Sequence, residues 1–278
     1  MSLFKSIADI DSLENRDPEM ISRLIRLFKP LFWRYFQPDI RGLERIPTGP
    51  GLFVGNHSGG MLMPDLFIFG MALHEHFGMA GLPFGMAHEF GLRVPLLNQL
   101  FLPIGAVRGC PENARRLLAR GEKLLIYPGG ELDLMRPFRD RHRIVFGPHR
   151  GYIRLALQEG VPIIPVVSCG AHETLFIIHD NRWLAQALGL DRFLSLKTWP
   201  LLFCLPWGLW CGPPPPHFPF PSRIHMEVCS PITFKRKGTK AASDSEYVEA
   251  CHRQVHAFME NVLEKLAVER RRRKNRWP

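Results

Sequence analysis

The chain has 278 residues, of which 46% are hydrophobic, and a formal charge of +10 at pH 7. This apolar content suffices for one globular unit with a sizeable core, and no run reaches the roughly 18 uninterrupted apolar residues of a membrane-spanning helix. The first residues lack the basic start and apolar block of a signal peptide, so we expect neither a secreted nor a membrane-spanning protein. The charge indicates an anionic partner, which is either nucleic acid, anionic lipid or a phosphorylated substrate.

No metal centre is expected from the cysteine and histidine spacing. His88-Glu89 and the pair His74 and His76 lack a third ligand at a recognisable distance along the chain, so we interpret them as surface or core residues. The six cysteines form no C-x-x-C pair, which argues against a zinc site or a disulfide framework and predicts buried thiols in a reducing cytosol: Cys110, Cys169, Cys204, Cys211, Cys229 and Cys251.

Residues 20–36 predict a basic amphipathic helix. Cations at Arg23, Arg26 and Lys29 lie away from its apolar face. The helix lies either in a bilayer interface or on the protein's own core, and its aromatic content favours the membrane. The apolar face comprises Ile21, Leu24, Ile25, Phe28, Phe32 and Phe36.

Beyond residue 50, short apolar runs alternate with helical patterns. This alternation predicts an α/β fold with a mostly parallel central sheet flanked by helices, preceded by the N-terminal amphipathic helical element. We expect strands over 51–55, 101–107, 123–127 and 161–167, and helices over 64–76, 111–120 and 149–159. The expected organisation is N-terminal helices over 1–40, a catalytic domain over 41–235, and a C-terminal helix with a basic tail over 236–278 within the same globular unit.

Two later segments have a distinctive composition. The aromatic and proline-rich stretch 199–221 predicts an apolar loop or broken helix, which serves either as a lipid-facing lip or as a strap over the core. Ser243 with Glu246 is typical of a capping box that opens the last helix, whose core stripe runs from Val248 to Leu266. The basic run 270–274 is either a solvated tail or a lipid contact.

Chemistry is indicated first by His57, which follows a predicted strand in a glycine-containing turn. A histidine there lies at the carboxyl edge of an α/β sheet, where active sites form. A neutral imidazole can remove a proton from a hydroxyl, and a carboxylate such as Asp65 can orient it and stabilise the imidazolium. A lone His and Asp at this spacing are more often structural, so a catalytic role needs further motifs elsewhere in the chain.

Three further segments follow in order: Gly105-Ala106-Val107-Arg108, Tyr127-Pro128-Gly129-Gly130-Glu131 and Val161-Pro162-Ile163-Ile164-Pro165-Val166. With Asn56-His57 and Asp65, they resemble the four ordered blocks of the glycerolipid acyltransferase superfamily. The resemblance spans roughly residues 40 to 235. His57 and Asp65 are separated by seven residues where four are usual, and the third block is P-G-G-E where P-E-G-T-R is usual. Both departures, and the run 150–157, resemble the monoacylglycerol and diacylglycerol acyltransferase branch.

The resemblance implies roles for these blocks. His57 would be the general base and Asp65 its orienting partner, while the head group of the acceptor would lie against two segments. The first segment contributes Gly105 and Arg108, and the second contributes Pro128, Gly129, Gly130 and Glu131. Arg108 alternatively contacts the donor or is structural if the acceptor is neutral. Backbone N–H groups of Ser58-Gly59-Gly60 are candidates for the oxyanion hole.

Other residues near the blocks are alternative candidates. Arg136, Arg139 or Arg141 is a candidate for the missing arginine of the third block, although such a run is usually solvated. Gly170-Ala171-His172-Glu173 leaves a strand at the same sheet edge and either lines the site or is structural.

The predicted function is therefore O-acyl transfer from acyl-CoA or an acyl carrier protein to a glycerolipid hydroxyl, of the mono- or diacylglycerol or lysophosphatidate type, in phospholipid or glycerolipid synthesis. The expected partners are membrane lipids and the acyl donor, on the cytoplasmic face of a membrane, with no cofactor and no nucleic acid. The alternatives are a catalytically silent lipid-binding protein of the same fold and a basic nucleic-acid-binding protein, for which the sequence shows no binding motif. The oligomeric state stays open.

Overall fold

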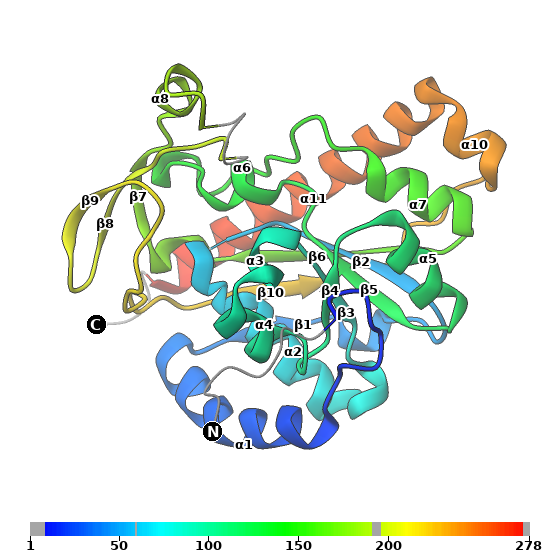
Figure 1. The fold of residues 1–278 in the computed structure, drawn as a ribbon, viewed down its shortest axis with the longest axis horizontal. Helices are drawn as coiled ribbons and strands as arrows, with labels where there is room; N and C mark the ends of the chain where they lie inside the picture. Colours follow the sequence, from blue (N-terminus) through cyan, green and yellow to red (C-terminus); the bar gives the residue numbers. More distant parts are fainter. Residues whose placement is uncertain (1–8, 59, 191–195, 275–278) are drawn as a thin grey trace.

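A seven-stranded sheet forms the centre of the molecule (Figure 1). The computed structural model describes residues 9–58, 60–190 and 196–274. The strands lie in the order β1, β10, β6, β2, β5, β3, β4. Their bounds are β1 Asp39–Arg41, β2 Gly51–Gly55, β3 Phe84–Ala87, β4 Ala106–Arg108, β5 Lys123–Ile126, β6 Ile163–Cys169 and β10 His225–Val228.

Most of the sheet is parallel. Strands β6, β2, β5, β3 and β4 all run in one direction, and β10 pairs antiparallel to β6 with β1 parallel to it at the edge. Consequently the carboxyl ends of the five parallel strands meet at one edge, where α/β sites form. The predicted α/β class with a mostly parallel sheet is confirmed.

The central strands are buried on both faces. Along β2, Leu52 and Val54 join one apolar cluster, while Phe53 joins the cluster on the opposite face. Such alternation inside continuous apolar runs is what a doubly covered parallel sheet requires. The first face is covered by α5 Pro111–Ala119, α7 Gly151–Glu159, α10 Thr239–Ser243 and α11 Ser245–Lys274, and the second by α1 Pro18–Phe36 and α2 Pro64–Phe77.

Helix α1 confirms the predicted helix but not the predicted orientation of its apolar face. Ile21 and Phe36 are buried in the cluster beneath the sheet, and Ile25 and Phe32 pack against it. The face interpreted as lipid-directed is therefore mainly a core face, although Phe28 stays 38% exposed.

Three other local predictions need correction. The apolar run 101–107 is not one strand: helix α4 Pro95–Phe101 extends to its start, and β4 begins only after Gly105, whose φ of +96° suits glycine. The last helix is capped by Asp244, which accepts from the Tyr247 N–H at 3.0 Å, so Ser243 is not the cap. The thiols of Cys110 and Cys211 are not buried, whereas those of the other four cysteines are.

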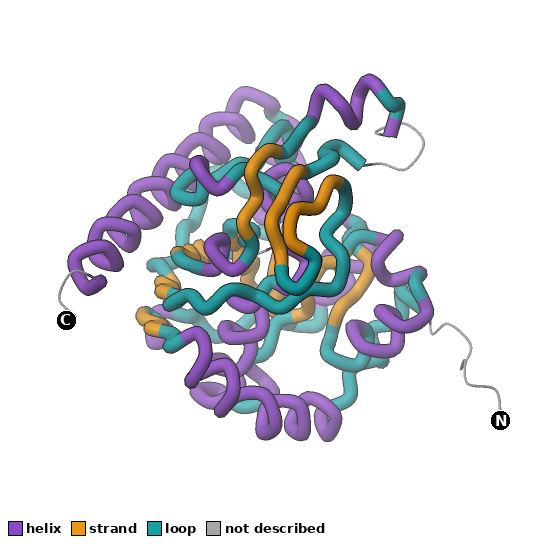
Figure 2. The backbone as a smooth tube through the Cα atoms, turned by 90° about the vertical axis from the view of Figure 1, so that its left-hand side faces the viewer, coloured by secondary structure: helices purple, strands orange, loops and turns teal. Residues whose placement is uncertain are grey.

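The stretch 199–221 contains two strands followed by a mainly irregular segment over 212–221, so it is a loop only in part and contains no helix. Strands β7 Phe176–His179, β8 Leu201–Cys204 and β9 Gly208–Cys211 form a three-stranded antiparallel sheet, which projects beside the main body in Figure 1 and faces the viewer in Figure 2. We call this sheet with its connections to residue 218 the flap. Among the described helices, none combines the length and apolar composition needed to cross a membrane.

The remaining short helices lie at the edges of these layers: α3 Glu89–Arg93, α6 Gly130–Leu134 and α8 Arg182–Ala187. Of the basic run 270–274, Arg270 is not solvated. Its guanidinium forms an ion pair with Glu173 and donates to the Ser222 hydroxyl.

Candidate active site

Asn56 joins the end of β2 to the neighbouring strand β6. Its side-chain oxygen accepts from the Ser168 N–H at 2.8 Å, and its side-chain nitrogen donates to the Ser168 carbonyl at 2.9 Å. The side chain therefore imitates a backbone pairing beyond the point where β2 stops. This fixes the chain direction immediately before His57.

His57 leaves the carboxyl end of β2 and stacks on Tyr127, which follows β5. The two rings are 4.5 Å apart between centroids and inclined by 17°. Gly55 makes this possible, because a Cβ there would lie 2.5 Å from the Tyr127 ring. The stack holds the imidazole over the edge of the sheet while part of the residue stays accessible.

The imidazole of His57 is neutral at physiological pH. Burial, together with the positive charge of Arg136, lowers the pKa of His57 to about 3. A neutral imidazole can accept a proton, but the imidazolium that results is costly in this environment. A negative charge nearby would make proton transfer easier.

Asp65 lies in the first turn of α2 and is 2% exposed. Burial raises the pKa of its carboxyl to about 7, although a hydrogen bond from the Leu66 N–H opposes the shift. The Ser168 hydroxyl lies close enough to lower this pKa, yet it forms no hydrogen bond of standard geometry.

His57 stacks on Tyr127, and the charge of Asp65 acts on the same residue. Within the described part of the chain, no hydrogen bond or ion pair of standard length links His57 to Asp65. Burial raises the pKa of Tyr127, the ring on which His57 stacks, and the charge of Asp65 adds to this shift. Asp65 therefore lies near the ring beside His57 without a direct hydrogen bond to the imidazole.

A buried ion pair holds the backbone of His57. The carboxylate of Asp133 accepts the His57 N–H at 2.6 Å, and the guanidinium of Arg136 donates to the His57 carbonyl at 2.5 Å. The two side chains pair with each other at 2.9 Å and are 0% and 1% exposed. Asp133 also accepts the Val145 N–H at 3.0 Å. Both polar groups of the His57 peptide are thus fixed.

Sequence reasoning missed Asp133 and placed Arg136 differently. Arg136 was a candidate for a substrate contact, but it lies beneath the site with its guanidinium enclosed. Asp133 follows the P-G-G-E segment by two positions, and this nearness to a predicted block is the only signal that pointed to it. Tyr127, directly before that segment, was likewise given no role.

The third block shapes the loop and does not present free side chains. A Cβ on Gly129 would lie 2.3 Å from both the Asp133 Cβ and the Val145 carbonyl oxygen, so only glycine fits between them. The Glu131 carboxylate accepts from the Lys197 N–H at 2.9 Å and the Thr198 N–H at 2.8 Å. Glu131 therefore anchors the segment of the flap that leads into β8. Pro128 and Gly130 lie in the same turn, with Gly130 at a φ of +49°.

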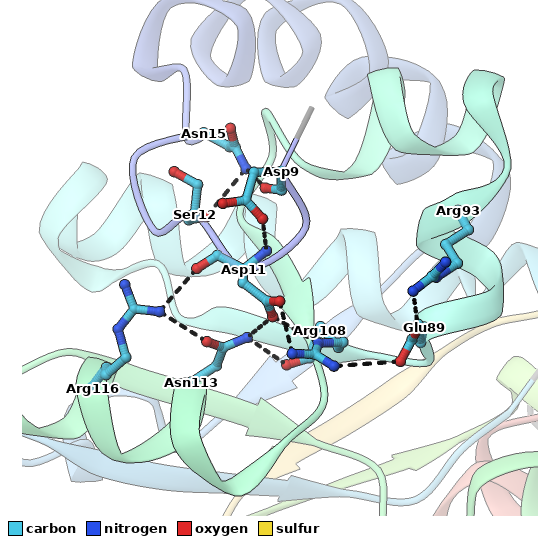
Figure 3. A network of polar contacts seen from close by, with 9 residues as sticks. All are labelled: Asp9, Asp11, Ser12, Asn15, Glu89, Arg93, Arg108, Asn113 and Arg116. Atoms are coloured by element: carbon cyan, nitrogen blue, oxygen red, sulfur yellow. Dashed lines mark hydrogen bonds and ion pairs between the residues drawn. The ribbon is translucent and has the colours of Figure 1, made fainter. Parts of the chain in front are cut away.

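The second block places Arg108 at the carboxyl end of β4, on the same edge of the sheet as His57. Its guanidinium binds the Asp11 carboxylate through two hydrogen bonds of 2.7 Å each (Figure 3). Gly105 lies against the side chain of Arg16 at the start of this strand. Arg108 is therefore already occupied by the chain itself.

The other candidate residues have separate positions. His172 is buried, and its Nε2 lies 2.8 Å from the Arg136 carbonyl oxygen, so it supports the ion pair from behind. Arg139 is 71% exposed. The Arg141 guanidinium lies over the Phe138 ring, and its Nε is 3.6 Å from a carboxylate oxygen of Glu173. Of the predicted oxyanion turn, Gly59 lies outside the described residues.

The described residues contain no cluster of side chains that could bind a metal ion. No three His, Cys, Asp or Glu side chains there converge as a metal site would require. His76 packs instead on Phe77 at the far end of α2, and His88 with Glu89 borders the hollow beside Arg108.

The chain resembles known acyltransferases over part of its length. The family model for acyltransferases matches residues 37–169. An uncharacterized protein of Mycobacterium tuberculosis is 29% identical over 258 residues, which cover 92% of this chain and 69% of the relative. The human DGAT1/2-independent enzyme synthesizing storage lipids is 29% identical over 152 residues, 53% of this chain and 45% of that enzyme.

The fold has a counterpart among solved structures. The 1-acyl-sn-glycerophosphate acyltransferase PlsC of Thermotoga maritima superposes with a TM-score of 0.51 at 17% identity, covering 90% of this chain and 84% of that one. The chain therefore has the α/β fold of a solved acyltransferase. Residues 37–169 thus match an acyltransferase domain, and the relatives and the fold resemble the glycerolipid acyltransferase superfamily.

Proposed function

We propose that this acyltransferase moves a fatty acyl group from acyl-CoA or an acyl carrier protein to a hydroxyl of a glycerolipid, with His57 as the general base. The observation that carries the proposal is the His57 imidazole itself. It is neutral, partly accessible, stacked on Tyr127 and held by its backbone at the edge of the sheet. The storage-lipid relatives support a mono- or diacylglycerol acceptor, and the PlsC fold is compatible with a lysophosphatidate.

The reaction needs one proton transfer and no covalent intermediate on the protein. The imidazole takes the proton of the acceptor hydroxyl while the hydroxyl oxygen attacks the thioester carbonyl. The tetrahedral oxyanion then reforms the carbonyl and expels the thiolate, which takes the proton from His57. The products are the ester and the free thiol, and backbone N–H groups near Ser58 and Gly60 are the proposed oxyanion donors.

Asp65 gives this mechanism a pH dependence. Because the pKa of its carboxyl is raised to about 7, the carboxylate that can stabilise the imidazolium is present above that pH and lost below it. His57, with a pKa of about 3, stays neutral over the same range. We expect kcat/KM to rise between pH 6 and 8 with a midpoint of about 7.

Measuring this profile on purified protein with labelled acyl-CoA tests the role of Asp65. Asp65→Asn should lower kcat by roughly two orders of magnitude and remove the rise. A variant that keeps the wild-type profile would mean that another group orients His57. Product identification by mass spectrometry, with several donors and acceptors, determines the substrate pair.

The proposal includes peripheral attachment to the cytoplasmic face of a membrane through the flap. Trp207 and Leu209 are 53% and 65% exposed, and Phe218 is 70% exposed. No acidic residue occurs from 199 to 226. The Trp207 and Trp210 N–H groups donate to proline carbonyls within the flap, so their rings enter an apolar phase without unpaired donors.

Helix α1 continues this apolar surface. The Tyr35 hydroxyl donates to the carbonyl of Pro219, the residue that follows the flap, at 2.6 Å, which joins the end of α1 to the base of the flap. Leu27 and Leu31 are 68% and 58% exposed on the side of α1 opposite its core face, beside the exposed cations Arg26 and Arg34. Apolar side chains flanked by cations suit a bilayer with anionic lipids.

The attachment is tested by co-sedimentation with phosphatidylcholine vesicles that contain phosphatidylglycerol. Trp207→Ser combined with Leu209→Ser should weaken binding by about tenfold or more, because each side chain loses an apolar environment. Phe258→Ser is the matched control, since Phe258 is 40% exposed on α11. Equal binding of the double variant and the wild type would exclude the flap as the membrane contact.

A further inference from the structure

The guanidinium of Arg108 is bound by acidic side chains of the same chain. Both of its hydrogen bonds to Asp11 are 2.7 Å long, and its remaining terminal nitrogen lies 3.5 Å from Glu89. The guanidinium beside Asp11 lowers the pKa of that carboxyl, so the carboxylate is ionised at neutral pH. The fork that would bind a phosphate through two hydrogen bonds is already filled.

The segment that carries Asp11 is fixed in place by several further contacts. Asn113 donates to the Asp11 carboxylate at 2.7 Å, and Arg116 donates to the Asp11 carbonyl at 3.1 Å. The Arg108 N–H donates to the Ile10 carbonyl, and Glu14 forms an ion pair with Arg120 at 2.6 Å. The carboxylate is thus a built part of this edge of the sheet.

The surrounding charges balance. Figure 3 shows Arg93, Arg108 and Arg116 together with Asp9, Asp11 and Glu89, and Arg93 pairs with Glu89 at 2.6 Å. Glu89, Arg93 and Arg108 of this cluster line a hollow of about 450 Å³ together with His88, Gly109 and Cys110. Because Asp11 pairs with Arg108 from outside this lining, a ligand in the hollow meets polar groups whose arginine charges are already compensated.

We propose that Asp11 is a specificity determinant that neutralises Arg108 and selects acceptors whose head group is an uncharged hydroxyl, such as a mono- or diacylglycerol, over acceptors that carry a phosphate. This inference rests on the proposed acyl transfer. A phosphate monoester carries close to two negative charges at neutral pH and would meet the Glu89 carboxylate and an arginine that Asp11 already neutralises. A glyceride hydroxyl donates to a carboxylate instead, so the same groups attract it.

Asp11→Asn tests the charge with little change of shape. The amide keeps an oxygen for Asn113 and leaves the segment in place, while the Arg108 guanidinium loses its counter-ion. The ratio of kcat/KM for lysophosphatidate to that for monoacylglycerol should rise roughly fivefold or more, because like-charge repulsion is removed and a cation is freed.

Glu14→Gln is the matched control, because it removes the other ion pair of the same segment without touching Arg108. The control should leave the ratio unchanged. An equal change in both variants would trace the effect to displacement of the segment and overturn the proposal, as would a wild-type enzyme that already prefers lysophosphatidate, or an unchanged ratio in Asp11→Asn.

Failure of the acyl transfer itself is distinguishable from failure of this inference. If the wild type acylates no glycerolipid, the proposed function is wrong. The charge selection is then measured by calorimetric binding of lysophosphatidate below its micellar concentration. Binding that is roughly fivefold tighter to Asp11→Asn than to the wild type supports the selection, and equal binding overturns it.

Discussion

Replacing His57 with alanine should lower kcat by about 10²- to 10⁴-fold while leaving the fold and the attachment to vesicles intact. General-base assistance contributes about that much, and no other described imidazole lies at the end of β2 to take its place. The imidazole makes its closest ring contact with Tyr127, and the backbone of residue 57 keeps its bonds to Asp133 and Arg136 after the substitution. The chain at this position therefore stays in place.

The measurement is single-turnover transfer from labelled acyl-CoA to a glyceride, with circular dichroism to monitor the fold. His76→Ala is the control, because that histidine lies near the other end of α2 against Phe77. Near-wild-type turnover by His57→Ala would remove His57 from the mechanism. Loss of turnover in both variants would show that the assay reports stability and not chemistry.

The sheet was predictable where strands are buried on both faces. Strands β2, β5 and β6 each contain a short apolar run, at 52–54, 124–126 and 163–167, and in a chain where it alternates with helical patterns such a run predicts a buried strand. Strands β1 and β10 were not predictable, because three or four residues without alternation become strands only when they pair with partners distant in the chain. The flap was missed because proline-rich segments predict loops, and its prolines lie mainly outside the paired residues.

The candidate site was predictable to the extent that its chemistry lies in adjacent residues. His57 was found from a strand end, a turn and an aspartate, all within one segment. Asp133 and Asp11 act on residues that are 76 and 97 positions away, so no local pattern reports them. An aspartate has the same appearance in a sequence whether it is solvated or holds a peptide group in a buried site. Arg108 was predicted to bind the head group because the sequence does not show that Asp11, in the N-terminal segment, binds its guanidinium.

The ion pair under His57 should be the most sensitive polar contact in the protein. Asp133→Asn is expected to destabilise the fold by about 3 to 5 kcal/mol, because it leaves the charge of Arg136 buried without a counter-ion. The amide also has one acceptor oxygen for two backbone donors, the N–H groups of His57 and Val145. Asp140→Asn is the matched control. Asp140 lies 3.5 Å from Arg139, whose side chain is 71% exposed, and such a pair contributes about 0 to 1 kcal/mol.

Two measurements separate the structural role of this pair from its effect on catalysis. Thermal unfolding should show a fall in Tm of about 10 °C for Asp133→Asn and at most a few degrees for Asp140→Asn. Turnover measured well below the lowered Tm should also fall for Asp133→Asn, with kcat reduced more than KM is raised, because the peptide of His57 loses one of its two anchors while the acceptor site is untouched. A variant that is destabilised but turns over at the wild-type rate when folded would show that Asp133 supports the loop without holding His57 in its working position. A variant as stable as the wild type would contradict the burial of the charge, since an unpaired guanidinium that is 1% exposed has no solvent to compensate it.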